Sequence, residues 1–278
     1  MTQFIKSRKS IFILILIILS LILVTSLILK PKNIEQISAK LHVESGIVKL
    51  NDNIIQSTAE IKQSDIIETE SDGFAVVILY DSIIISLDPK TKITTDEIIK
   101  NHPKINQEEG NTWNTFTNIL GVEQYSIKTS DSIASVRGTS FGITKDKILV
   151  GEGIVDYTKN QQVFFVNNLE VVEATNRIPI KRNASKIELE IIKKNMERAA
   201  KEAELIENNI ARNEIISKTQ QALDNLNQAI LNYDKSQQIE KFNETINNQE
   251  NNLNKTKEPS HNQPTNTAEN NTPEEPTP

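Results

Sequence analysis

Alternation of apolar and polar residues within residues 132–157 constrains the fold of this chain more than any other sequence feature. Inside this stretch, Thr139, Phe141 and Ile143 share one face of the alternation, and Ser140 and Gly142 share the other. Strict alternation is typical of β-strands that bury one face. Gly138 interrupts the pattern, and a glycine inside a strand usually marks a bulge or a close approach of two backbones. The stretch therefore predicts short strands with a kink at Gly138 that redirects Arg137.

Arg137 lies among alternating apolar residues, so we expect its guanidinium to be partly buried. An unpaired buried charge is very costly, so a carboxylate or backbone carbonyls should bind it. We therefore predict a structural role at the bulge, with ligand contact as the alternative. On this interpretation Arg137→Leu lowers the melting temperature of a soluble fragment of residues 33–180.

Further apolar runs of strand length recur on both sides of this stretch. They are residues 41–50, 54–61, 74–80, 83–87, 122–127, 163–166 and 171–172. Many short strands at close spacing predict an all-β sandwich, barrel or solenoid-like domain. Residues 96–121 are the least strand-like part, and we expect a helical turn over 109–120 that packs Trp113 and Phe116. The fold class is thus a mainly β domain over residues 33–180.

The motif inside residues 132–157 resembles that of the FecR-type extracytoplasmic domain. Its residues are Val136, Arg137, Gly138, Thr139 and Phe141, followed by Glu152, Gly153 and Val155. Residues 64–69, 83–94 and 125–129, and Gly110 with Trp113, match further features of that family in order. The family's Asp-Gly-Ser turn reads Asp81-Ser82 here, which leaves that turn type open. The resemblance covers residues 40–175 and implies a β-rich domain outside the cytoplasm.

Residues 11–29 form an uncharged apolar run near the N-terminus. At a rise of ~1.5 Å per residue, a helix of this length spans a hydrocarbon core of about 30 Å. A cleaved signal peptide is the alternative, although its apolar region is normally shorter. Lys6, Arg8 and Lys9 precede the run, which favours a cytoplasmic N-terminus at residues 1–10 and the remaining chain outside. We therefore predict a single-pass protein of the cell membrane, anchored in the lipid bilayer.

This topology bears on what the resemblance implies. The regulators that gave the FecR family its name control a sigma factor through a cytoplasmic N-terminal segment. Ten residues cannot bury the ~800 Å² per partner that a stable protein interface usually needs. We therefore expect that the anti-sigma role does not transfer to this chain.

Residues 184–255 lack glycine and proline and are predicted to be helical. Their apolar residues step by three and four, as in a heptad-like seam. Examples are Ile192, Met196, Ala199, Ala203, Ile206 and Ile210. Two interpretations remain open, a helix or helical hairpin that packs on the β-domain and a coiled coil that joins copies of the chain into a homo-oligomer. Residues 256–278 are rich in Pro, Asn, Thr and Glu, so we expect a disordered tail.

Several functional classes are disfavoured by the residues themselves. The chain has no Cys, and its three His residues have no paired spacing, so we predict no metal site and no cofactor. Residues 138–142 match G-x-S-x-G, but a strand pattern follows Ser140 where a nucleophile elbow needs a helix. Residues 33–180 hold 13 Lys/Arg against 21 Asp/Glu, a balance that repels nucleic acid. We therefore expect a protein that is not an enzyme.

The expected function is that of a membrane-anchored binding or scaffolding module at the cell envelope, and a signalling assembly is one setting for it. Its partner would be an envelope protein or a cell-surface polymer. The first alternative is a transmembrane signal transducer that works through a membrane partner. The second is a structural coiled-coil stalk.

Overall fold

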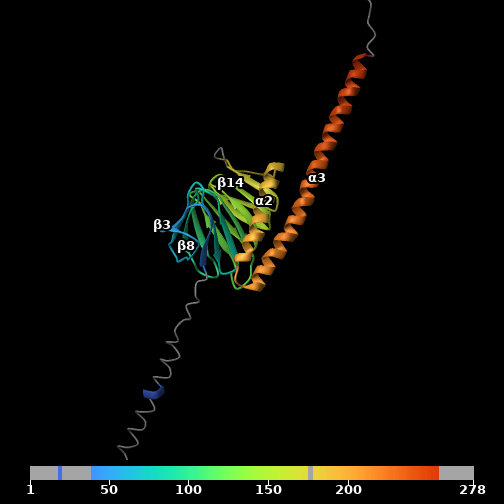
Figure 1. The fold of residues 1–278 in the computed structure, drawn as a ribbon. Helices are drawn as coiled ribbons and strands as arrows, with labels where there is room; N and C mark the ends of the chain where they lie inside the picture. Colours follow the sequence, from blue (N-terminus) through green and yellow to red (C-terminus); the bar gives the residue numbers. More distant parts are fainter. Residues whose placement is uncertain (1–17, 21–38, 175–177, 257–278) are drawn as a thin grey trace, which may run out of the picture. The chain divides into compact units, whose positions relative to one another are not determined.

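The computed structural model describes residues 18–20, 39–174 and 178–256, with side chains described as far as residue 249 (Figure 1). The chain divides into two compact units, residues 1–226 and 227–278. The strands of the first unit are β1 (Ala39–Ser45), β2 (Val48–Leu50), β3 (Asn53–Ile55), β4 (Thr58–Glu60), β5 (Ile66–Thr69), β6 (Phe74–Leu79), β7 (Ile83–Leu87), β8 (Lys92–Glu97), β9 (Lys104–Glu109), β10 (Thr112–Phe116), β11 (Tyr125–Lys128), β12 (Ser132–Val136), β13 (Thr139–Ile143), β14 (Lys147–Glu152), β15 (Ile154–Lys159), β16 (Gln162–Asn167), β17 (Glu170–Glu173) and β18 (Ile180–Asn183).

These strands form two nine-stranded sheets. Sheet 1 has the order β18-β17-β14-β13-β10-β7-β6-β1-β4, and sheet 2 has the order β16-β15-β12-β11-β9-β8-β5-β2-β3. Neighbouring strands are antiparallel except for the parallel pair of β9 and β11. The chain passes repeatedly from one sheet to the other, usually after a hairpin of two strands. The fold is therefore a mainly β, two-sheet domain, as the strand spacing predicted.

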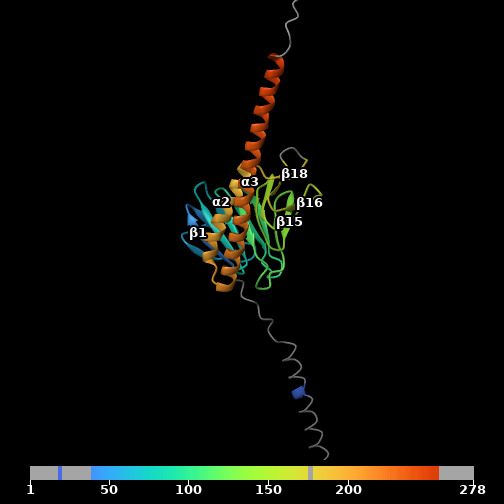
Figure 2. The ribbon, with the colours of Figure 1, turned by 90° about the vertical axis from the view of Figure 1, so that its right-hand side faces the viewer.

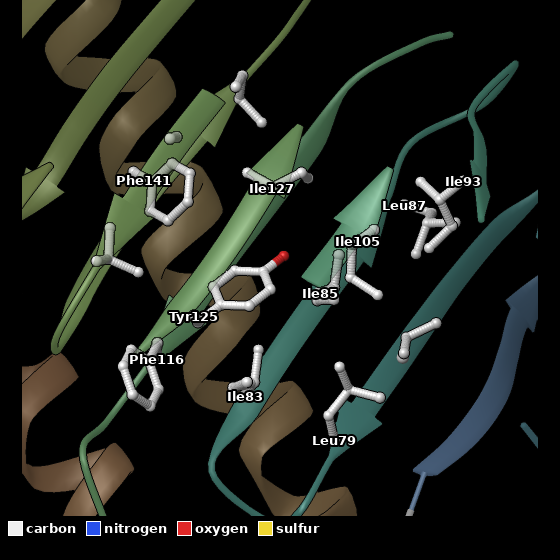
Figure 3. Close-up of a cluster of buried hydrophobic side chains, with 14 of the residues drawn as sticks. Leu79, Ile83, Ile85, Leu87, Ile93, Ile105, Phe116, Tyr125, Ile127 and Phe141 are labelled. Carbon is white, nitrogen blue, oxygen red and sulfur yellow. The ribbon is translucent and has the colours of Figure 1, made fainter. Parts of the chain in front are cut away.

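The main hydrophobic core lies between the two sheets (Figure 3). Sheet 1 contributes residues such as Leu79, Ile83, Ile85 and Phe141, and sheet 2 contributes residues such as Ile93, Ile105, Tyr125 and Ile127. Each fully buried side chain of this size contributes about 1.5–3 kcal/mol to folding. The Tyr125 hydroxyl would be costly there without a partner, and it donates to Asn114 Oδ1 at 2.7 Å.

The outer face of sheet 1 is also buried over its central strands β7, β10 and β13, because helical segments cover it there (Figure 2). These segments are α2 (Lys186–Glu202), η1 (Ala203–Leu205) and the first part of α3 (Asn209–Thr256). A second core joins Val76, Ile78 and Ile84 of the sheet to Ala203, Ile206, Ala211 and Ile215. The compact unit that contains both sheets therefore also includes these helical segments as far as residue 226.

A capping box starts α2 at Ser185. The Ser185 side chain accepts from the Glu188 N–H, and the Glu188 side chain accepts from the Ser185 N–H. These bonds satisfy two backbone donors that a helix end leaves without partners. In α2 the seam residues Ile192, Met196 and Ala199 face the sheet and are fully buried. The seam from Ile192 to Ile206 therefore packs within the chain, whereas Ile210, predicted to belong to it, is 81% exposed.

One local expectation is wrong, and one turn left open by the sequence is resolved. The helical turn predicted over 109–120 is wrong, because β10 places Trp113 on the outer face of sheet 1 and Phe116 in the main core. The turn at Asp81-Ser82 forms without glycine, since Tyr80 and Asp81 take left-handed conformations with φ of 55° and 52°.

The predicted anchor over residues 11–29 lies outside the described residues, apart from 18–20. Among the residues that the structure describes, no helix combines the length and apolar character needed to cross a bilayer. The tail predicted over 256–278 also falls outside, apart from Thr256.

Candidate functional site

The FecR-like motif occupies two neighbouring passages of the chain between the sheets. Gly138 connects β12 of sheet 2 to β13 of sheet 1, and Gly153 connects β14 of sheet 1 to β15 of sheet 2. A Cβ at Gly153 would lie 2.6 Å from the Gly138 carbonyl oxygen, and Gly153 has a φ of +82°. Glycine is therefore required at this position. Thr139 Oγ1 donates to the Ile154 carbonyl oxygen at 3.0 Å and joins the two passages.

The remaining motif residues serve different parts of the same unit. Val136 lies opposite Val155 across β12 and β15, and both are buried in the main core with Phe141. Glu152 lies opposite Ser140 at the end of β14, and burial raises the pKa of the Glu152 carboxyl. The motif thus specifies the two connections between the sheets, from β12 to β13 and from β14 to β15.

The predicted burial of Arg137 is wrong. Along β12 the buried face carries Ala134 and Val136, so Ile133 and Arg137 belong to the opposite face, which is open to solvent. Arg137 is exposed, and its guanidinium has no hydrogen bond or ion pair with any residue of the described chain. It lines a hollow of about 170 Å³ together with Gln124, Ser135, Val136, Ile154 and Asp156. An Arg137 side chain in this position is available to a partner.

Large apolar side chains are exposed beside Arg137 on the outer face of sheet 2. The exposed fraction is 44% for Ile133, 53% for Ile154, 62% for Val163 and 63% for Phe165. Thr158 of β15 pairs with Ile133 of β12 on one side and with Val163 of β16 on the other, so these three side chains are neighbours across the three strands. We call this surface the β12–β15–β16 face; its residues are Ile133, Ser135, Arg137, Ile154, Asp156, Thr158, Val163 and Phe165.

The free edge of β16 is partly blocked. Lys181 Nζ donates to the Phe165 carbonyl oxygen at 2.8 Å, and the Asn167 N–H donates to Glu170 Oε2 at 2.8 Å. Lys181 and Glu170 also form an ion pair at 2.8 Å. Charged side chains that occupy edge groups discourage the addition of another strand. A partner would therefore bind the face of sheet 2 at this end rather than extend its edge.

A pocket of about 380 Å³ lies on the outer face of sheet 1, beside α2. Trp113, Leu149 and Ile191 give it an apolar lining. A Cβ at Gly142 would lie 2.9 Å from the Trp113 ring, and one at Gly151 would lie 3.2 Å from it. The absence of side chains at these two glycines makes room for the indole. The N–H of Trp113 is buried and has no acceptor among the described residues.

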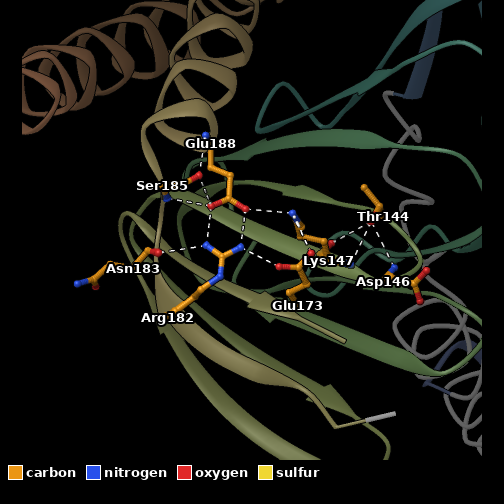
Figure 4. Close-up of polar contacts among 8 residues, drawn as sticks. All are labelled: Thr144, Asp146, Lys147, Glu173, Arg182, Asn183, Ser185 and Glu188. Carbon is orange, nitrogen blue, oxygen red and sulfur yellow. Dashed lines mark hydrogen bonds and ion pairs between the residues drawn. The ribbon is translucent and has the colours of Figure 1, made fainter. Parts of the chain in front are cut away.

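One wall of this pocket is a charged network (Figure 4). Arg182 binds Glu188 at 2.6 Å and Glu173 at 2.8 Å, and Lys147 binds the same carboxylates at 3.0 Å and 3.3 Å. The bond from Arg182 holds the pKa of Glu188 well below its usual range, despite the burial that opposes ionisation. The network remains ionised near neutral pH and fixes the start of α2 on β14 and β17.

Sequence reasoning missed this pocket. The available signal is the sole Trp of the chain together with Gly142 and Gly151, which lie on the neighbouring strands β13 and β14. The sequence pattern instead predicts a helical turn around Trp113. Ser140, the serine of the G-x-S-x-G match, lies within β13 and donates to Thr115 Oγ1. In the described part of the chain, no group of three His, Cys, Asp or Glu residues could hold a metal ion.

Comparison with known proteins supports the resemblance of the motif. The family model described as FecR protein matches residues 65–155. Two crystal structures of a proposed anti-sigma factor from Parabacteroides distasonis ATCC 8503, at 2.50 Å and 1.65 Å resolution, match with 18% sequence identity and a TM-score of 0.40. Each match covers 45% of this chain and 63% or 64% of the solved chain, so this chain spans less than two thirds of those proteins. Comparison with curated proteins gives no match.

Proposed function

We propose that this chain is a non-catalytic binding module of the cell envelope whose FecR-type domain recognises a protein partner in a signalling assembly. Residues 11–29 would anchor it in the lipid bilayer with residues 1–10 in the cytoplasm. The match of residues 65–155 to the FecR family supports a regulatory role. The partner is an envelope protein, and the scaffolding of a cell-surface polymer is the competing form of the same proposal.

The β12–β15–β16 face is the observation that carries this proposal. Exposed apolar residues gathered on one face commonly mark a protein interface. Aromatic residues and arginine contribute most of the binding energy at such interfaces. Phe165 and Arg137 provide both types of residue, and the Arg137 guanidinium has no partner within the described chain. The expected partner surface is apolar and carries a carboxylate that can bind Arg137.

Site-specific photo-cross-linking of the full-length chain in intact cells tests this face. A photoreactive residue at Phe165 should trap one defined membrane protein, whereas the same residue at Glu108, also exposed on sheet 2, should not. Arg137→Glu should abolish the product because it opposes the expected carboxylate. Equal products from positions 165 and 108 would contradict the proposal, and a trapped wall polymer would favour the scaffolding form.

Protease accessibility in intact cells tests the anchor and its orientation. If residues 33–278 lie outside the membrane, external protease degrades them without lysis of the cells. Full protection until lysis would place this part of the chain in the cytoplasm and contradict the proposed localisation.

Self-association as a stalk is a second candidate function, now restricted to residues 227–255 because residues 186–226 pack on sheet 1. Ile239 and Phe242 are large, apolar and exposed in this part of α3. The chain has no native Cys, so Phe242→Cys in the full-length protein provides a single reporter. Disulfide-linked dimers would support a coiled coil, and a strictly monomeric protein would exclude it.

A further inference from the structure

The pocket beside α2 has the size and lining of a small-molecule site. Its volume of about 380 Å³ falls in the range of ligand pockets, which are mainly apolar with a few oriented polar groups. Trp113 and Leu149 from sheet 1 and Ile191 from α2 supply the apolar part. Residues on the β9–β10 and β13–β14 turns supply polar groups at the rim, among them Asn111, Thr144 and Asp146. This pocket is separate from the β12–β15–β16 face, which lies on the other sheet.

The charges around the pocket are balanced. Each of the four carboxylates that line it has a cationic partner nearby. The pairs are Asp88 with Arg198 at 2.7 Å, Asp146 with Lys159 at 3.9 Å, Glu173 with Arg182 at 2.8 Å and Glu188 with Lys147 at 3.0 Å. An anionic ligand would have to take a cation from one of these carboxylates, and breaking a partly buried ion pair is costly. A cationic ligand would gain little from carboxylates whose charge a cation already offsets. The balance therefore favours an uncharged ligand.

The hydrogen-bonding groups at the rim are mostly acceptors. Each ionised carboxylate offers about four lone-pair positions, more than its cationic partner uses. The side-chain amide of Asn111 makes no hydrogen bond within the described chain, so it can both donate and accept. Hydroxyl groups on the ligand could donate to the carboxylates, and the Asn111 amide could donate to their oxygens.

We propose that this pocket binds a single sugar ring. A pyranose is uncharged, presents C–H groups that can pack on the apolar lining, of which Ile191 is the exposed member at 44%, and carries several hydroxyls for the carboxylate and amide rim. The sugar could be a free monosaccharide or the terminal unit of a cell-surface polymer. The proposal goes beyond the protein-binding role and does not depend on it, because the two sites use different faces of the domain.

Tryptophan fluorescence gives a direct test, since Trp113 is the sole Trp of the chain. The full-length protein, in a detergent without a sugar headgroup, is titrated with glucose, galactose and N-acetylglucosamine, with butylamine and butyrate as charged comparators. We expect a saturable change in emission with at least one sugar, at a Kd of about 1–10 mM. The methyl glycoside of that sugar then separates the two sources, because a polymer end must bind with its anomeric oxygen substituted.

Variants on α2 show where the sugar binds. Ile191→Phe narrows the pocket and should weaken binding by about tenfold. Ile187→Phe makes the same change at an exposed position of α2 that does not line the pocket, and it should bind like the wild type. Asn111→Ala provides a second test if Ile191→Phe does not fold. The absence of a saturable response to every sugar up to about 50 mM, tighter binding of butylamine or butyrate, or an unchanged Kd in both pocket variants would overturn the proposal.

Discussion

Glu202 at the end of α2 should make the attachment of the helices to sheet 1 depend on pH. Its carboxyl is almost fully buried and accepts a hydrogen bond from Ser86 Oγ of β7. Arg198 Nε lies 3.4 Å from Glu202 Oε1, while Asp88 and Glu44 add negative charge nearby. Burial raises the pKa of Glu202 to about 7, although Ser86 and Arg198 oppose the shift. The last turn of a helix further disfavours a carboxylate.

The magnitude follows from the shift in pKa. The value rises from 4.5 when unfolded to about 7 when folded, and at about 1.4 kcal/mol per unit this corresponds to about 3 kcal/mol. Between these values the folded protein binds more protons than the unfolded chain, so the free energy of unfolding decreases as pH rises from 4.5 to 7. Above pH 7 the full penalty is present. Glu202→Gln keeps the shape and removes the charge, so it should stabilise the protein by about 1–3 kcal/mol at alkaline pH.

Urea denaturation of the full-length protein at pH 5 and pH 8 measures this effect. The wild type should lose stability between the two pH values, and Glu202→Gln should lose much less. Glu204→Gln removes a carboxylate from an exposed position two residues away and should keep the wild-type dependence. A Glu202→Gln protein that is less stable than the wild type at pH 8 would refute the reasoning, because the buried charge would then contribute to stability.

Three further predictions concern the motif and the start of α2. Arg137→Leu should change the free energy of unfolding by less than about 0.5 kcal/mol in a thermal melt, because the side chain is exposed and unpaired. Glu188→Gln should lower the free energy of unfolding by about 1–3 kcal/mol at pH 7. The pKa of Glu188 is depressed chiefly by its bond to Arg182, so the variant should lose less stability in acid than the wild type when stability is measured against pH. Gly153→Ala should lower the free energy of unfolding, measured in urea, by more than about 1 kcal/mol. Gly121→Ala should lower it less, because both glycines have positive φ but only at Gly153 would a Cβ lie 2.6 Å from a backbone carbonyl oxygen.

The sequence was sufficient to predict strands where the apolar pattern has one interpretation. The run over 83–87 is apolar throughout and forms β7, which is buried on both faces because the main core lies on one side and the helices on the other. It was insufficient at β10, where Trp113, Asn114 and Thr115 do not alternate in polarity although all are buried. Burial of the polar side chains there depends on partners from other strands, such as Tyr125 for Asn114. Local patterns do not contain that information.

Arg137 shows a second limit of the sequence pattern. Period-two alternation identifies two faces but does not state which is buried when both carry apolar residues. In β12, Ile133 lies on one face, and Ala134 and Val136 lie on the other. The second face is buried in the core, where Val136 lies opposite Val155. The register with β15 therefore places Arg137 in solvent. The pocket was equally unpredictable, because Trp113, Lys147 and Glu188 meet only after β10, β14 and α2 have assembled.

The two sheets differ in what they can offer a partner. In sheet 1 the central strands β7, β10 and β13 are buried on both faces, and the pocket beside Trp113 lies where α2 leaves part of the outer face open. Sheet 2 buries only one face, and its outer face is polar over β8 and β9 but apolar at β12, β15 and β16. Apolar side chains that face water on an exposed sheet cost free energy, and a partner that covers them removes this cost. The physical case for a protein interface therefore depends on that end of sheet 2, and the case for a small ligand depends on the gap beside α2.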